Sequence, residues 1–143
     1  MKKRLTPKQR LRRDLRKQKK REKRLIEVNV NKDLKSKYQT WSKSVKERDN
    51  YVCQVCQKSF KYAKPQSIQS AHILSKENYP ELMYDLNNGL VLCFRDHKNS
   101  SISSHLDGFA FTQWFKEKFP DRYEYLVNKL KELKEKKESP LLI

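Results

Sequence analysis

Hydrophobic side chains are scarce in this chain, and long apolar runs are missing. They make up 36% of its 143 residues, so the core must be small and part of the chain must be solvated. Near the N-terminus Leu5, Leu11 and Leu15 stand isolated among cations, which excludes the pattern of a secretory signal or a membrane span. We therefore expect a cytoplasmic protein without a membrane partner.

Cysteine is also scarce, and its placement is informative. An odd count of three, without a secretory segment, argues against a disulfide framework and for a reducing compartment. There a Cys-x-x-Cys pair is metal-binding or redox-active, and the redox case requires a βαβ setting that the sequence lacks. Cys53 and Cys56 have the spacing that lets two thiolates reach one Zn²⁺ ion at ~2.3 Å each, and Cys93 and Asp96 repeat it. We expect these four residues to form a structural zinc site, the alternative being free thiols in a small apolar cluster.

Acidic residues are almost missing from the first part of the chain. Residues 1–24 hold 14 Lys or Arg against Asp14 and Glu22, a net charge of +12, which leaves +5 of the total of +17 for the rest. Thr6 and Pro7 suit the N-cap and first position of a helix whose apolar stripe is sparse, so we expect residues 1–33 to form an arm that stays frayed until it meets a polyanion. Counterion release favours nucleic acid as the partner, over a solubilising tail or an anionic membrane.

The remaining hydrophobic residues predict helices on both sides of a hairpin. An amphipathic helix is expected over 34–47, ending at Asp49 and Asn50. Residues 67–74 around His72 predict a first strand, and residues 89–93 a second strand that the Asn87-Asn88-Gly89 turn opens. Later residues recur at helical spacing as core positions, with Pro120 starting a further helix; they are Phe111, Trp114, Phe115, Phe119, Tyr123, Leu126, Val127, Leu130 and Leu133.

Several segments occur in an order typical of one enzyme family. They are RDNYVCQVCQK at 48–58, AHILSKENYPEL at 71–82 and DLNNGLVLC at 85–93, followed by Asp96 and His97. Together they resemble the small HNH nucleases of the ββα-metal type common in phages and mobile elements. The resemblance implies an α+β fold over residues 34–143, in which a two-stranded hairpin and a short helix, stapled by zinc, are flanked by helices.

The resemblance also implies a reaction. His72 would be the general base, Asn88 would pin the loop that orients it, and His97, at the start of the short helix, would hold one divalent ion (Mg²⁺, Mn²⁺ or Ni²⁺). The expected activity is hydrolysis of DNA phosphodiester bonds, leaving a 3′-hydroxyl and a 5′-phosphate, in the cytoplasm of a bacterium or a phage-infected cell. Neutral imidazole suits a base at physiological pH, and double-stranded DNA would bind through the basic arm and the HNH site.

Two positions depart from the family pattern. Ala71 precedes the base where relatives often have a metal ligand, and Ser101 stands where some place another histidine. Since this leaves the ion short of ligands, we expect His105 to supply a second contact beside His97; the alternatives are that His105 is a bystander and that His97 binds zinc. Asp96, where relatives usually carry cysteine, would bind zinc less tightly.

A catalytically weakened HNH scaffold that binds DNA or structured RNA, or an RNA-associated basic zinc protein, remains the alternative function.

Overall fold

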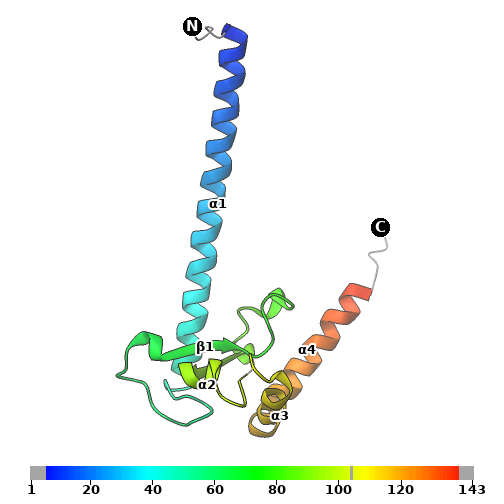
Figure 1. Cartoon of the computed structure of the whole chain (residues 1–143). Coiled ribbons are helices and arrows are strands. Elements are labelled where there is room, and N and C mark those ends of the chain that lie inside the picture. Colours follow the sequence, from blue (N-terminus) through cyan, green and yellow to red (C-terminus); the bar gives the residue numbers. More distant parts are fainter. Residues whose placement is uncertain (1–5, 104, 139–143) are drawn as a thin grey trace. The chain divides into compact units, whose positions relative to one another are not determined.

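The computed structural model describes residues 6–103 and 105–138 and has the predicted α+β class (Figure 1). A two-stranded antiparallel sheet is accompanied by four helices. The strands are β1 (Ile68–His72) and β2 (Gly89–Cys93), and the helices are α1 (Pro7–Arg48), α2 (Phe94–Lys98), α3 (Gly108–Lys118) and α4 (Pro120–Glu138). Short 3-10 turns lie at Pro65–Ser67, Pro80–Leu82 and Leu86–Asn88. Contacts between Cα atoms divide the chain into two units between Gln39 and Thr40. Among the described helices, none is long and apolar enough to cross a membrane.

Helix α1 begins where the sequence predicts. The amide of Gln9 donates to the Thr6 hydroxyl, the Gln9 side chain accepts from the Thr6 amide, and Pro7 occupies the first helical position. The helix expected for the arm is present, since α1 is continuous from Pro7 to Arg48, and its fraying in the absence of a polyanion stays a prediction. No glycine or proline occurs between Lys8 and Arg48, and Lys, Arg, Gln and Leu are good helix formers.

The last turns of α1 carry the contacts with the hairpin. Trp41 and Val45 are buried, whereas Leu34 and Tyr38, expected to share the covering face, are 43% and 38% exposed. The helix ends as predicted, with Asn50 in the left-handed region at a φ of 52°. Only the final two turns of the expected 34–47 helix therefore contribute to the core.

The hairpin lies close to its predicted position and has side chains packed on both faces. Ala71 pairs with Leu90 and His72 with Gly89. Because side chains alternate along a strand, Ala71 and Gln69 share one face and His72 lies on the other. On the His72 face, a Cβ atom on Gly89 would lie 2.5 Å from Val45 Cγ2 and 2.8 Å from the Trp41 ring, so only glycine permits this close approach.

The core consists of two clusters, one against each face of the sheet. The first joins β2 and the cysteines to α3 and α4, and its buried members are Cys53, Ala71, Leu90, Leu92, Cys93, Phe111, Phe115 and Leu126. The second is smaller and comprises Trp41, Val45, Ile68 and Val91. Pro120 starts α4 as predicted, and the predicted aromatic core positions 111 and 115 are buried.

Candidate active site and metal centre

Four side chains converge beside the end of β2. The thiols of Cys53 and Cys93 lie 3.2 and 3.3 Å from Asp96 Oδ2, and Cys56 Sγ lies 4.0 Å from Cys93 Sγ. One ligand atom from each of these four residues falls within 4.8 Å of every other, which is the grouping that the two x-x-spaced pairs predict. A tetrahedral ion bound at ~2.3 Å to sulfur places its ligand atoms roughly 3.5–4 Å apart. The four residues are thus placed to hold a metal ion, in a manner compatible with structural zinc.

Backbone geometry around Cys53 forms the first pair into a knuckle. The amide of Cys53 donates to the Lys58 carbonyl, and the amide of Gln57 donates back to the Cys53 carbonyl. Gln57 takes a φ of 58°, which turns the chain back on itself after Cys56. The amide of Gln54 donates to the Val91 carbonyl, so the knuckle is attached to β2, which ends in Cys93.

The electrostatics of this cluster suit a cation. Burial raises the pKa of Cys53 to about 12 and also raises the pKa of Cys93, so both thiols keep their protons unless a cation replaces them. Burial also acts to raise the pKa of Asp96, but hydrogen bonds from Arg95 and the thiols outweigh it and lower that pKa to about 2. Arg95 Nε donates to the other carboxylate oxygen at 3.0 Å, which leaves Oδ2 facing the thiols.

His72 is held at the end of β1 by a stacking contact and a hydrogen bond. Its ring is parallel to that of Trp41, with centroids 4.2 Å apart, and its Nε2 lies 2.8 Å from the carbonyl oxygen of Met83. A carbonyl only accepts, so Nε2 carries the proton and Nδ1 is the basic nitrogen. Burial lowers the pKa of His72, helped by the charge of Lys76 and opposed by the Met83 carbonyl. The imidazole is therefore neutral at physiological pH.

Asn88 ties together the two ends of the loop that follows His72. Its Oδ1 accepts from the Leu74 amide at 2.7 Å, and its Nδ2 donates to the carbonyls of Leu74 and Leu82, both at 3.0 Å. The side chain is fully buried, and its backbone carbonyl accepts from the Ile73 amide. Asn88 therefore contacts the backbone at Ile73, one residue after His72, and at Leu82, one residue before Met83.

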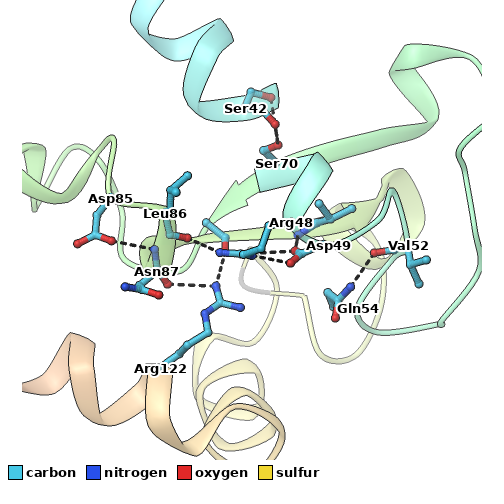
Figure 2. Close-up of polar contacts among 12 residues, drawn as sticks. Ser42, Arg48, Asp49, Val52, Gln54, Ser70, Asp85, Leu86, Asn87 and Arg122 are labelled. Atoms are coloured by element: carbon cyan, nitrogen blue, oxygen red, sulfur yellow. Dashed lines mark hydrogen bonds and ion pairs between the residues drawn. The ribbon is translucent and has the colours of Figure 1, made fainter. Parts of the chain in front are cut away.

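A pair of arginines that the sequence analysis missed holds the turn carrying Asn88. Arg48, at the end of α1, donates to the carbonyls of Leu86 and Gly89 and is ion-paired with Asp49 (Figure 2). Arg122, from α4, reaches the same turn and donates to the carbonyls of Asn87 and Gly89. Burial, together with the charge of Arg48, lowers the pKa of Arg122 to about 10. The turn is thus fixed from two helices that are distant in sequence.

Asp85 links this turn to the stacking partner of His72. Its backbone carbonyl accepts from Trp41 Nε1 at 3.0 Å, and its carboxylate accepts from the Asn87 amide and from the Tyr125 hydroxyl, both at 2.8 Å. The position of the His72 ring therefore depends on contacts from α1, α4 and the turn together.

His97 and His105 come together after α2. Nδ1 of His97 lies 2.6 Å from the side-chain oxygen of Gln69 and must donate to it, which leaves Nε2 as the basic nitrogen. That Nε2 lies 3.1 Å from Nε2 of His105, which also lies 3.4 Å from the ammonium of Lys98. Burial, then the charges of His105 and Lys98, lowers the pKa of His97 to about 4. Two nitrogens that face each other at this distance share either a proton or a cation, and cis ligands of one octahedral cation lie ~3 Å apart.

The structure also places the remaining predicted positions. His97 is the fourth of five residues in α2 rather than at its start. Its ring bonds to Gln69 and His105 and to no residue of the cysteine cluster. Ser101 follows the end of α2 in a turn and is exposed, and His105 occupies the loop expected for it. Ala71 is 2% exposed within the first core cluster, so it has no polar atom to offer.

Gln69 places His97 on the face of the hairpin opposite to His72. The two strand residues are three apart, and side chains alternate between faces. The four cluster residues and the two later histidines are thus brought together in two groups, and His72 with Asn88 forms a third around the loop 74–82.

Comparison with known proteins gives no relative for this chain. No family model, no curated protein and no solved structure matches it. The function is therefore inferred from the geometry of these three groups.

Proposed function

We propose that this protein is a metal-dependent endonuclease of the HNH type that hydrolyses DNA phosphodiester bonds. The observation that carries the proposal is the order of His72, Asn88 and His97 along one hairpin and its following helix, each held by a contact suited to its role. His72 keeps a basic Nδ1, Asn88 pins the loop beside it, and His97 presents a basic Nε2 toward His105.

His72 suits the role of general base. Its Nε2 is committed to the Met83 carbonyl, so the proton of an attacking water would be taken by Nδ1. Stacking on Trp41 holds the ring in one orientation, and burial keeps it unprotonated. A fixed base of this kind removes the cost of orienting the water and the acceptor in the reaction step.

His97 and His105 would hold the catalytic cation. A divalent ion bound there would neutralise charge on the phosphate and the leaving oxygen. Gln69 fixes the His97 ring as an outer-shell partner, and the Lys98 ammonium would have to leave His105 Nε2 when the ion binds. Two imidazoles are a small protein ligand set, so water and substrate oxygens would fill the other positions.

The placement of His72 and His97 on opposite faces agrees with the family pattern. In that pattern a metal ligand often directly precedes the base, and consecutive residues of a strand point to opposite faces. Ala71, at the ligand position, lies on the face that contacts His97 through Gln69. The scissile phosphate would then have to lie across the end of the hairpin, where β1 ends in His72.

The metal site gives the first testable prediction. Replacing His97 with alanine should abolish cleavage. His105→Ala should raise the Mg²⁺ or Mn²⁺ concentration needed for half-maximal cleavage by about tenfold or more, since loss of a direct ligand should cost at least as much as loss of an outer-shell partner. The measurement is plasmid nicking as a function of metal concentration. If His105→Ala leaves the metal dependence unchanged, His105 is not a ligand and the cation is held by His97, water and phosphate alone. The control is Lys116→Ala, because Lys116 is exposed on α3.

The basic arm gives the second prediction. Cations gather on one side of α1, where Arg12, Arg13, Arg16, Lys17 and Lys20 line a shallow surface. Each phosphate contact contributes about −0.9 to the slope of log K against log salt on duplex DNA, so changing all five to alanine should flatten that slope by up to ~4.5.

The matched control changes five lysines of α4 to alanine, namely Lys129, Lys131, Lys134, Lys136 and Lys137. Two of these are ion-paired, Lys129 with Glu132 and Lys137 with Glu81, against one of the five on α1 (Arg13 with Asp14), so their loss should affect the slope less. Equal slopes for the two variants would show that the arm does not bind DNA phosphates and would favour a solubilising role for it.

Nicking of supercoiled plasmid in the presence of Mg²⁺, Mn²⁺ or Ni²⁺ tests the proposed function directly. Cleavage that requires the metal and leaves 3′-hydroxyl and 5′-phosphate ends is the expected result. A second candidate, a nucleic-acid-binding protein on an HNH-like scaffold, is favoured by the buried Ala71, which leaves the cation two imidazoles. Tight DNA binding without cleavage under any of the three metals would support that alternative.

A further inference from the structure

A shallow depression of about 390 Å³ lies beside the cysteine cluster, away from the His72 loop. Its lining residues are Cys56, Lys58, Phe60, Ser67, Cys93, Phe94 and Arg95. We call this the Phe94 surface.

The charge around the Phe94 surface is positive and uncompensated on its loop side. Between Asn50 and Ser75 the sequence has three lysines (Lys58, Lys61 and Lys64) and no acidic residue. On the other side, Arg95 is held by its Nε against Asp96 while its side chain stays 64% exposed. None of the lining residues is acidic, and Asp96, the partner of Arg95, is buried among the thiols, so the lining presents cations to solvent.

Aromatic rings accompany these cations. Phe94, the first residue of α2, is 54% exposed although it follows a strand that is buried throughout. Tyr62, on the loop with the lysines, is 94% exposed, and the ammonium of Lys61 lies 5.8 Å from its ring centre. Exposed aromatic rings among cations match the chemistry of nucleic acid with accessible base faces.

We propose that the Phe94 surface binds unpaired DNA, with a base stacked on Phe94 and the adjoining phosphates near Lys58 and Arg95. A duplex offers its phosphates but keeps its base faces covered, so it would use the cations and leave the aromatic ring without a role. The inference rests on the proposed function only in taking DNA as the nucleic acid. It adds that the bound DNA carries an unpaired segment at the opposite end of the hairpin from His72.

The test compares single-stranded and duplex DNA of one sequence, each carrying a fluorescent label, by anisotropy. The full zinc-loaded chain is used without chelator and without Mg²⁺, Mn²⁺ or Ni²⁺, so binding is measured whether or not the protein cleaves. Salt is raised until the contribution of the arm is small. Stacking on one aromatic ring is worth roughly 5- to 150-fold in affinity, so Phe94→Ala should weaken single-strand binding by that factor.

Duplex affinity should change less than about twofold in the same variant. Phe94→Trp should retain single-strand binding, because it keeps an aromatic face. The matched control is Phe109→Ala, since Phe109 is 76% exposed on α3, away from this surface, and its loss should leave both affinities unchanged. Zinc content and circular dichroism of each variant report on folding.

A strand with an abasic position tests the same stacking contact without altering the protein. Wild-type protein should bind it about as weakly as Phe94→Ala binds the intact strand. The proposal is overturned if Phe94→Ala loses affinity equally for single-stranded and duplex DNA, or if its affinity is unchanged. An acidic protein partner would then be the alternative for this surface. If the protein does not nick plasmid but the difference between single-strand and duplex affinity persists, the nuclease proposal is refuted and the proposed role of the Phe94 surface stands.

Discussion

Replacing His72 with alanine is expected to lower the rate of DNA cleavage by roughly 10²–10⁴-fold, the usual contribution of a positioned base. The affinity for DNA should be almost unchanged, since the cations of α1 and of the Phe94 surface remain. Single-turnover cleavage of plasmid measures the first quantity, and anisotropy in the absence of a catalytic cation measures the second. Full cleavage by this variant would remove the proposed mechanism.

His72→Phe is the more stringent variant. It keeps a ring that can stack on Trp41 but has no basic nitrogen, so it separates the loss of the base from the loss of packing. The pH profile of the wild type gives a second check. Burial lowers the pKa of His72 below its ordinary 6.5, so cleavage should persist as pH falls through 6.5 and decline only when the ring becomes protonated at lower pH.

Loss of the metal centre should have the other large effect. Cys53→Ser is expected to lose bound zinc together with cooperative unfolding, because the binding energy of a structural zinc site, ~10–16 kcal/mol in small peptides, is folding energy. Cys53 is fully buried, the neighbouring Gln54 amide attaches the knuckle to β2, and the two core clusters are small. Metal analysis and thermal unfolding followed by circular dichroism measure both losses.

Substitutions of Asp96 should change zinc affinity by smaller amounts than the loss of a cysteine. Asp96→Ala should weaken zinc less than Cys53→Ser, because a thiolate is the stronger ligand, and Asp96→Cys should tighten it. Ser59→Ala is the control, since Ser59 is exposed and pairs with Val52 through the backbone. Stoichiometric zinc in the Cys53 variant would show that the ion binds elsewhere.

The hairpin and the metal centre were predictable because their determinants are local. An Asn-Asn-Gly turn followed by four apolar residues specifies β2, and two x-x-spaced pairs specify the cysteine cluster. The start of α4 at Pro120 follows from the same kind of signal. In each case a few neighbouring residues determine the local structure.

Other features depend on contacts between distant residues. Arg122 is 33 positions from Gly89, and no periodicity marks it as a partner of that turn. Trp41 was expected in the core, but its stacking on His72 depends on how α1 crosses the hairpin over Gly89. The exposure of Leu34 and Tyr38 likewise shows that an amphipathic pattern does not reveal at which residue the helix becomes buried. Such facts require the tertiary structure.

The two arginines at the Asn88 turn have a consequence for mutational tolerance. They bind the carbonyl oxygens of Leu86, Asn87 and Gly89, which every amino acid possesses. Substitutions of the exposed Leu86 side chain should therefore be accepted freely, whereas Arg48 and Arg122 should tolerate almost none. In a saturation library the permissive positions would lie within the turn beside the proposed catalytic loop, and the restricted ones on two helices remote from it in sequence.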